Sequence, residues 1–292
     1  MINNIVIFLQ NRNFFGTQVT HIPFLCEVKY LYPQARITII TKHKVSSILK
    51  ELSYCDNIIF ENNKKELIQE YRKINPEITY NLRNKSLSTQ MIMTLFNRKT
   101  KIGYSTNFTK IFFSKTFESN TSIYRSLNYL RLIDKKFNPV NIKKRDVVSI
   151  LPGAGGKFKI WNLENYIKVA KFIESHYPLK VEFILGNEEK NMLEELKENF
   201  IVHFHTDITT LETNIYSSKL VIGNDCGPSH FAQISDVKTL ILYSYEKNDA
   251  KEVISEWFNL QKNKYYLIGE KEKAIDTISV ENVINKIKEI LE

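Results

Sequence analysis

Residues 4–41 read NIVIFLQNRNFFGTQVTHIPFLCEVKYLYPQARITIIT, and this stretch decides the fold. It begins with a short apolar run at residues 4–9 that is rich in β-branched side chains, which is typical of a buried strand. Residues 22–31 then carry apolar side chains at helical spacing, and Pro33 follows them. Residues 36–41 form a second apolar run. A strand, a helix and a strand in this order predict a βαβ unit, which requires a parallel sheet with a right-handed crossover.

The alternation of strands and helices continues to the end of the chain. Further strands are expected at residues 57–60, 78–82, 101–103, 147–151, 181–185, 201–204, 220–223 and 239–242. Further helices are expected at residues 45–52, 64–74, 86–96, 124–133, 163–176, 188–200, 211–217, 229–234 and 280–291, the last of them packing back on the N-terminal domain. Periodicity lapses at residues 138–145 (NPVNIKKR), which favours a linker. The 292 residues therefore predict two Rossmann-like, doubly wound α/β domains, 1–145 and 146–292.

The formal net charge of +9 hides a difference between the two halves. Residues 1–145 hold 24 Lys and Arg against 9 Asp and Glu, so their balance is 24 − 9 = +15. Residues 146–292 hold 17 against 23, so their balance is 17 − 23 = −6. A basic half of this size indicates an anionic partner, which can be nucleic acid, an anionic membrane, or a phosphorylated or acidic substrate. A solvated basic surface without a ligand is the alternative.

Neither the hydropathy nor the cysteines point to an exported or disulfide-linked protein. No apolar stretch approaches the roughly 18 residues of a transmembrane helix, and residues 1–10 lack the basic start of a signal peptide. Cys26, Cys55 and Cys226 show no metal-ligand spacing, which favours buried thiols over a zinc site or a disulfide framework. We therefore expect a cytoplasmic protein, and its basic half would favour peripheral association with an anionic membrane face.

A glycine-rich turn, PGAGGKFK at residues 152–159, follows the strand expected at 147–151. Backbone N–H groups in such a turn can approach a phosphate closely. The turn matches neither a Walker A loop nor G-x-G-x-x-G, because Phe158 stands where each needs another residue. The glycines are equally typical of an ordinary turn, but Lys157 and Lys159 favour an anion site.

A second turn, GNDCGP at residues 223–228, joins a strand to a helix that is expected to begin at Ser229. The first N–H groups of that helix face the carboxyl edge of the sheet, where open α/β sheets bind ligands. Asp225 can accept hydrogen bonds from sugar hydroxyls, and Gly227 allows the close approach of a phosphate. A plain Asp-Gly turn, with His230 capping locally, is the alternative.

Other candidates carry less weight. His203 and His205 share one face of a strand, but no third metal ligand accompanies them. The sequence holds no Asp-x-Asp, which argues against the carboxylate pair that binds a divalent metal in many sugar transferases. Arg83 closes an N-terminal strand and can bind an acidic acceptor group bidentately, although a surface arginine without a ligand fits the sequence as well.

Four stretches resemble glycosyltransferase family 9, the ADP-heptose:lipopolysaccharide heptosyltransferases. Residues 223–233 (GNDCGPSHFAQ) resemble G-x-D-[ST]-G-x-x-H-L-A, and residues 151–166 resemble P-G-A…K-x-W-P-x-E-x-[FY]. Residues 16–39 resemble G-D-x(5)-P-x-L…Y-P-x-A-x-I, and NLRNKSLSTQ with KIGYS resembles the acceptor-side stretch. The four matches occur in the family's order and cover most of the chain.

The resemblance implies a GT-B fold with an ADP-sugar donor in the interdomain cleft, and an inverting heptose transfer to a lipopolysaccharide core without a metal or other cofactor. By position, Lys159 would hold the donor phosphates and Asp225 the sugar hydroxyls. The diphosphate site would be lined by Cys226, Gly227, Ser229 and His230. Looser candidates are Glu188 or Glu189 for the ribose and the stretch 206–208, beginning with Thr206, for the adenine.

Three residues depart from the family pattern. Thr17 replaces the aspartate that is the family's proposed base, and a threonine has no useful basicity near neutral pH. Cys226 replaces a serine or threonine, and Asn162 replaces a proline. His21 is the nearest substitute base in the sequence, although it can equally pack at the start of its helix.

Three other functions remain open at this stage. A GT-B transferase with a different nucleotide-sugar donor fits the same motifs, because nothing in them distinguishes the sugar. A sugar-nucleotide-binding pseudoenzyme would explain Thr17. Nucleic-acid binding would explain the basic half, but the sequence lacks an aromatic-basic RNA motif and a recognition helix.

Overall fold

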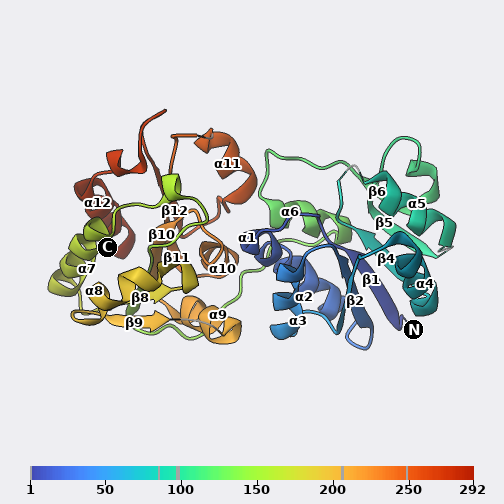
Figure 1. Cartoon of the computed structure of the whole chain (residues 1–292), viewed down its shortest axis with the longest axis horizontal. Helices are drawn as coiled ribbons and strands as arrows, with labels where there is room; N and C mark the ends of the chain where they lie inside the picture. The colour runs from blue at the N-terminus through green and yellow to red at the C-terminus, as the bar shows by residue number, and fades with distance from the viewer. Residues whose placement is uncertain (1, 85, 97–98, 205–206, 248) are drawn as a thin grey trace. The chain divides into compact units, whose positions relative to one another are not determined.

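The chain forms two compact units, Met1–Asn138 and Pro139–Glu292 (Figure 1). The structure is a computed structural model that describes residues 2–84, 86–96, 99–204, 207–247 and 249–292. In the described residues, no helix is long and apolar enough to cross a membrane. Each unit is built around its own six-stranded sheet.

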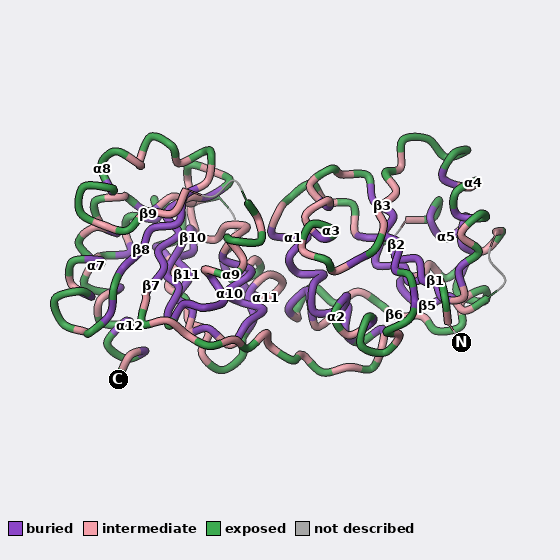
Figure 2. Tube along the Cα trace, turned by 90° about the horizontal axis from the view of Figure 1, so that it is seen from below, coloured by how far each residue is buried: buried purple, intermediate pink, exposed green. Residues whose placement is uncertain are grey.

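The N-terminal unit has a fully parallel sheet in the order β3-β2-β1-β4-β5-β6. Its strands are β1 (Asn4–Phe8), β2 (Arg36–Thr41), β3 (Asn57–Phe60), β4 (Ile78–Asn81), β5 (Thr100–Tyr104) and β6 (Lys115–Phe117). The central strand β1 is buried from Ile5 to Phe8, as Figure 2 shows along the trace. A parallel sheet is covered on both faces, which explains why its central strands are continuous apolar runs.

Helices connect or follow these strands. They are α1 (Phe15–Val19), α2 (Ile22–Leu31), α3 (Ile48–Glu51), α4 (Lys64–Ile74), α5 (Leu87–Phe96) and α6 (Arg125–Leu130). Helix α4 shows how local chemistry sets the ends: the Asn63 side chain accepts the Glu66 N–H, and Asn75 ends the helix in the left-handed region at φ 48°. Helix α1 begins in the segment that the sequence predicted to be a loop around Gly16.

The C-terminal unit repeats the arrangement with the order β12-β11-β10-β7-β8-β9, again fully parallel. Its strands are β7 (Val147–Leu151), β8 (Lys180–Leu185), β9 (Ile201–Phe204), β10 (Leu220–Asn224), β11 (Lys238–Tyr243) and β12 (Lys264–Ile268). Its helices are α7 (Leu163–His176), α8 (Leu193–Lys197), α9 (Ile208–Ser217), α10 (Ser229–Ile234), α11 (Ala250–Trp257) and α12 (Val280–Leu291). The predicted α/β class with doubly wound parallel sheets is confirmed.

Helix α12 packs within the C-terminal unit, and its expected packing on the N-terminal domain stays a prediction. Its buried residues Val283, Ile287 and Ile290 belong to the same apolar core as Val169 and Ile173 of α7. The buried stripe of α12 repeats at helical spacing and is fully used in this contact.

The segment 139–145 belongs to the C-terminal unit. Val140 pairs with the turn that follows α10: its N–H donates to the Ile234 carbonyl at 3.1 Å, and its carbonyl accepts the Asp236 N–H at 2.9 Å. Arg145 makes a bidentate ion pair with the buried Glu182. The division between the units falls at residue 138, at the start of the stretch 138–145 where periodicity lapses.

Candidate functional site

The two sequence turns meet at one edge of the C-terminal sheet. Strands β7 and β10 are parallel neighbours, with Leu151 in register with Gly223, so the turns that follow them leave the same edge. The strand order reverses here, because β8 follows β7 on one side while β10 lies on the other. Ligands of doubly wound sheets bind at such a switch point. The fold thus places both predicted turns where a nucleotide is expected.

Asn224 joins these two turns. It is fully buried, and its side-chain N–H donates to the Pro152 carbonyl at 2.7 Å. Its side-chain oxygen accepts hydrogen bonds from the Trp161 backbone N–H at 3.2 Å and from the Tyr166 hydroxyl at 2.9 Å. The sequence analysis did not select Asn224, because its role depends on partners more than 50 residues away along the chain.

Lys159 and Asp225 form an ion pair at this edge, with 2.5 Å between Lys159 Nζ and Asp225 Oδ2. Their side chains are 28% and 11% exposed, so the pair reaches solvent. The two residues predicted to hold donor phosphates and sugar hydroxyls are therefore brought into contact. Because solvent reaches the pair and weakens it, its partners can be exchanged for a ligand.

Lys247 adds a second positive charge to the edge. Its Nζ lies 5.1 Å from the centre of the Phe158 ring, and Lys159 Nζ lies 5.9 Å from the same ring. Lys247 comes from the loop after β11, a third loop on the same edge, and the sequence analysis did not identify it. The cluster is suited to an anionic group such as a diphosphate.

Cys226 and Ser229 use their side chains to shape the turn. The Ser229 hydroxyl donates to the Asn224 carbonyl at 2.8 Å, and Cys226 Sγ lies 3.1 Å from the same hydroxyl. Burial raises the pKa of the Cys226 thiol to about 11, so it stays neutral. These contacts fix the conformation of the segment around Gly227, and they leave its backbone as the part that can approach a ligand.

His230 is buried beside the ion pair and is neutral at physiological pH. Burial lowers its pKa to about 4; the negative charge of Asp225 opposes this shift, and Lys159 adds to it. The ring centre lies 6.1 Å from that of Trp257 in α11, and Gln233 Nε2 lies 3.4 Å from His230 Nδ1. A neutral imidazole at this position can take part in hydrogen bonding but does not supply a charge.

Of the two predicted ribose candidates, Glu189 lies closer to the glycine-rich turn. Its carboxylate accepts the Gly186 N–H at 2.9 Å, and a Cβ added at Gly153 would come within 2.1 Å of the Glu189 side chain. A side chain at residue 153 would therefore require the Glu189 side chain to move. Glu188 is exposed. Thr206 and His205 lie outside the described residues, and His203 contacts the buried Glu182 at 3.0 Å.

Arg83 does not fit the predicted role of binding an acceptor. Its side chain is 2% exposed and forms an ion pair with Glu61 at 2.8 Å. The guanidinium also donates to the carbonyls of Leu9 and Ile40 and to the Thr89 hydroxyl. It therefore joins the ends of β1, β2 and β4 from inside, because a buried guanidinium needs every N–H satisfied.

His21 does not fit the role of a substitute base. The side chain is fully buried and stacks on Tyr129 with 4.7 Å between ring centres. Burial lowers its pKa to about 3; nearby carbonyls of Gln18 and Thr17 oppose this shift, but neither ring nitrogen has a partner with good hydrogen-bond geometry. Thr17, in α1, is 3% exposed. A catalytic base must reach the proton it takes, which this packing prevents for His21.

Comparison with known proteins assigns the chain to a class. A family 9 glycosyltransferase from Veillonella parvula superposes with a TM-score of 0.72 at 17% identity, covering 99% of this chain and 97% of that one. The E. coli heptosyltransferase WaaC with ADP-2-deoxy-2-fluoro heptose superposes with a TM-score of 0.70 at 12% identity, covering 98% and 99%. The fold is that of the GT-B glycosyltransferases.

The sequence identifies the family within this class. The profile of glycosyltransferase family 9 (heptosyltransferase) matches residues 73–274. The chain is 27% identical over 265 residues to a lipooligosaccharide heptosyltransferase 2 from Campylobacter jejuni, covering 82% of this chain and 81% of that protein. The chain belongs to glycosyltransferase family 9, and it is a glycosyltransferase. The family resemblance predicted from the four motifs is confirmed.

Proposed function

We propose that this enzyme transfers a heptose from an ADP-heptose donor to an acidic lipooligosaccharide core. The observation that carries the proposal is the Lys159–Asp225 ion pair at the switch point of the C-terminal sheet. The relative from Campylobacter jejuni is a lipooligosaccharide heptosyltransferase, and the E. coli structure holds an ADP-heptose analogue. Both support this choice of donor and acceptor.

The ion pair gives a physical account of donor binding. When a diphosphate arrives, Lys159 exchanges the Asp225 carboxylate for phosphate oxygens, and Lys247 adds a second cation. Asp225 is then free to accept hydrogen bonds from the sugar hydroxyls. Before the donor binds, Lys159 and Asp225 neutralise each other. When it is bound, Lys159 contacts its diphosphate and Asp225 contacts its sugar.

The reaction is a single displacement at the anomeric carbon. The acceptor hydroxyl oxygen forms the new C–O bond while the bond to the β-phosphate oxygen breaks, and ADP leaves with the electron pair. Negative charge grows on the diphosphate, where Lys159 stabilises it; one well-placed group of this kind contributes roughly 10²–10³ to kcat in other enzymes. The hydroxyl proton passes to a base, for which the structure favours neither Thr17 nor His21.

The N-terminal unit is proposed to bind the anionic acceptor and the inner membrane surface. Residues 1–138 hold 21 Lys and Arg against 9 Asp and Glu, a balance of 21 − 9 = +12. Phe108 and Ile111 are 73% and 80% exposed on either side of Lys110. Apolar side chains beside basic ones favour an anionic lipid surface. Stronger co-sedimentation with anionic than with zwitterionic vesicles would support this part of the proposal.

The donor and acceptor are tested together by mass-spectrometric transfer assays. Purified enzyme is given ADP-heptose, ADP-glucose or UDP-sugars with truncated lipooligosaccharide acceptors. We expect heptose addition from ADP-heptose at a rate at least about 10-fold above the other donors. A preference for another nucleotide sugar would contradict the proposed donor, and binding of ADP-heptose without transfer would contradict the proposed reaction.

A further inference from the structure

Helix α10 carries Ser229 and His230 at the donor edge, and it is only six residues long. A helix of this length spans roughly 9 Å and is not stable by itself in water. The carbonyl groups of its last turn have no partner inside the helix. The positions of Ser229 and His230 therefore depend on the contacts that hold the C-terminal end of α10.

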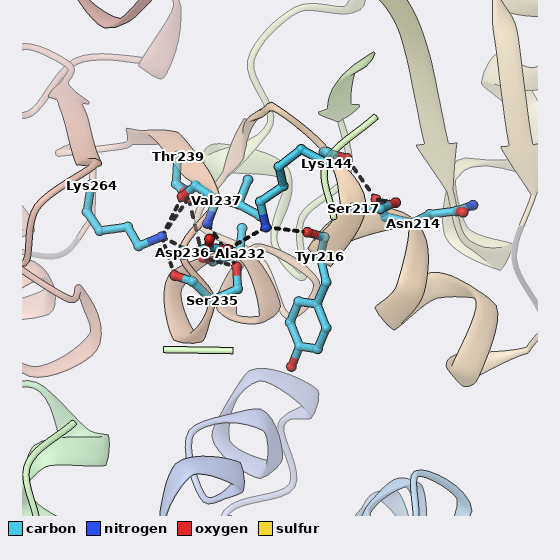
Figure 3. Close-up of polar contacts among 11 residues, drawn as sticks. Lys144, Asn214, Tyr216, Ser217, Ala232, Ser235, Asp236, Val237, Thr239 and Lys264 are labelled. Atoms are coloured by element: carbon cyan, nitrogen blue, oxygen red, sulfur yellow. Dashed lines mark hydrogen bonds and ion pairs between the residues drawn. The ribbon is translucent and has the colours of Figure 1, made fainter. Parts of the chain in front are cut away.

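Lys264, the first residue of β12, holds that end. Its Nζ donates to the carbonyls of Ala232 at 2.8 Å, Ser235 at 2.8 Å and Val237 at 2.5 Å, and it lies 3.3 Å from the Thr239 hydroxyl. Figure 3 shows the ammonium group surrounded by these oxygens. Three carbonyls from the last turn of α10 and from the turn that follows thus converge on one side chain. A cation also interacts favourably with the negative end of the helix dipole.

The ammonium group is held in a strongly desolvated position. Burial lowers the pKa of Lys264 to about 7; Asp236 opposes the shift, and Lys144 adds to it. A buried lysine is costly to the fold unless its donors are used. Here the three N–H donors of Lys264 bind carbonyls of α10 and of the turn after it. These hydrogen bonds offset the free-energy cost of burying the lysine.

A second buried side chain holds the same helix. Asn259, which lies beyond α11, donates its side-chain N–H to the Gln233 carbonyl at 2.9 Å, and its backbone N–H donates to the Gln233 side-chain oxygen at 3.0 Å. Gln233 in turn lies next to His230. The Gln233 side chain therefore connects Asn259, at the C-terminal end of α10, to His230 on the donor side.

Residues 139–145, which precede β7, also contact the turn after α10. Lys144 forms an ion pair with Asp236 and donates to the Tyr216 carbonyl at 2.8 Å, as Figure 3 also shows. Together with the Val140 pairing, this ties the turn to residues 139–145. Lys264 is the contact that reaches back into the last turn of the helix, at Ala232.

We infer that Lys264 is a positioning residue for the donor site, because it fixes the C-terminal end of α10 and thereby the placement of Ser229 and His230 beside Lys159 and Asp225. This inference rests on the proposed donor site. It predicts that losing the Lys264 ammonium weakens nucleotide binding without removing any group that touches the nucleotide.

The test compares Lys264→Met with Lys238→Met. Lys238 is the first residue of the neighbouring strand β11, and its Nζ donates to the Ile290 carbonyl near the end of α12 at 2.5 Å. The two lysines thus perform the same local task on different helices, and α12 carries none of the donor-site residues. We expect K264M to weaken ADP binding by about 10-fold in titration calorimetry, with a higher KM for the donor and a smaller change in kcat. K238M should bind ADP as the wild type does.

Hydrogen exchange measured by mass spectrometry gives the second readout. In K264M, the amides of residues 229–234 should exchange faster than in the wild type, and in K238M they should not. Lys264→Arg, which keeps a charged donor, should recover most of the ADP affinity. If K264M does not fold, Thr239→Val removes a hydroxyl that also contacts the Ala232 and Val237 carbonyls, and it should weaken ADP binding by about 3-fold.

The outcomes separate this inference from the proposed function. A wild-type enzyme that binds no ADP contradicts both. A wild type that binds ADP, with a folded K264M that binds it equally well, contradicts only the positioning role. Equal losses in K264M and K238M also contradict it, because they would show a general loss of stability. Unchanged exchange in residues 229–234 of K264M contradicts it as well, because α10 would then keep its position without the Lys264 ammonium.

Discussion

The carboxyl edges of the two sheets differ although the strand orders are equivalent. In both sheets the order in which strands are added reverses beside the first strand, between β1 and β4 in one unit and between β7 and β10 in the other. At the C-terminal edge, the Lys159–Asp225 pair is 28% and 11% exposed. At the N-terminal edge, the Arg83–Glu61 pair is 2% and 9% exposed. One topology thus supports an ion pair that can exchange partners and one that cannot.

The depth of each pair explains the difference. The C-terminal pair is partly exposed, mainly at Lys159, and solvent weakens such a pair toward the value of about 0–1 kcal/mol that is typical of fully exposed pairs. Breaking a buried pair costs about 3–5 kcal/mol because it leaves one charge without compensation. The N-terminal pair therefore acts on stability, and the C-terminal pair is available for a ligand. Substitutions in the two pairs should separate these effects.

The largest expected effect is at the buried pair. Arg83→Met leaves Glu61 without its partner and should lower the free energy of unfolding by about 3–5 kcal/mol, measured by urea denaturation. The double variant R83M/E61L should recover much of this loss, because no unpaired charge remains. If R83M unfolds like the wild type but loses acceptor binding, the contrast between the two edges is wrong.

Lys159→Met should have the opposite profile. We expect kcat/KM to fall by about 10²–10³-fold, because the growing diphosphate charge loses its cation, while the urea midpoint changes little. Lys157→Met, on the same 3₁₀ turn, is the matched control. An activity near that of the wild type would remove Lys159 from the donor site.

Thr17→Asp tests whether the N-terminal edge lacks only a base. Because Thr17 is 3% exposed, desolvation would raise the pKa of the new carboxyl toward the range of a useful base. Turnover of the native acceptor should be kept or raised, by up to about 10²-fold. Thr20→Asp is the control for an added charge nearby. A folded T17D with slower turnover would argue against this position as the base.

His21 should affect stability at low pH and leave the reaction unchanged. Its folded pKa of about 3 lies below the unfolded value of 6.5, so the unfolded chain binds more protons, and stability falls as the pH drops from 6.5 toward 3. His21→Leu should reduce that loss by about 2 kcal/mol between pH 7 and pH 5 in urea denaturation. His230, with a pKa of about 4, keeps its own contribution in both proteins. A large loss of kcat in H21L at pH 7 would restore the base hypothesis.

The smallest effect is expected at Cys226. Because its pKa is raised to about 11, the thiol is protonated and unreactive. Cys226→Ser should keep kcat/KM within about 2-fold, and iodoacetamide at pH 7 should not inactivate the wild type through this residue. Rapid inactivation that C226S abolishes would show a thiolate at the donor edge.

Asn162 shows a departure from the family pattern that the structure explains. The family places a proline after Trp161, and here the Asn162 side chain accepts the Glu164 N–H at 2.9 Å as the N-cap of α7. Both residue types suit the start of a helix. The departure therefore preserves the helix start by different chemistry.

The sequence by itself determined the elements and the turns. Helices α2, α4 and α7 and strands β2, β3 and β7 have the bounds that their periodicity predicted, because a strand or helix pattern and its end signals lie within one segment. The edge strand β12, which is only partly buried along its length, was not predicted. The two turns at residues 152–159 and 223–228 were found for the same local reason, since glycine, proline and asparagine act on the backbone beside them.

Only the tertiary structure decided which polar residues are free to act. Lys159 meets Asp225 across 66 positions of the chain, and Arg83 meets the Leu9 carbonyl across 74. Lys264 reaches Ala232 across 32. Burial and pairing over such distances depend on how strands are ordered in the sheet, and no local pattern encodes them. The same residue type therefore pairs with a carboxylate at the sheet edge at 159 and binds the carbonyls at the end of α10 at 264.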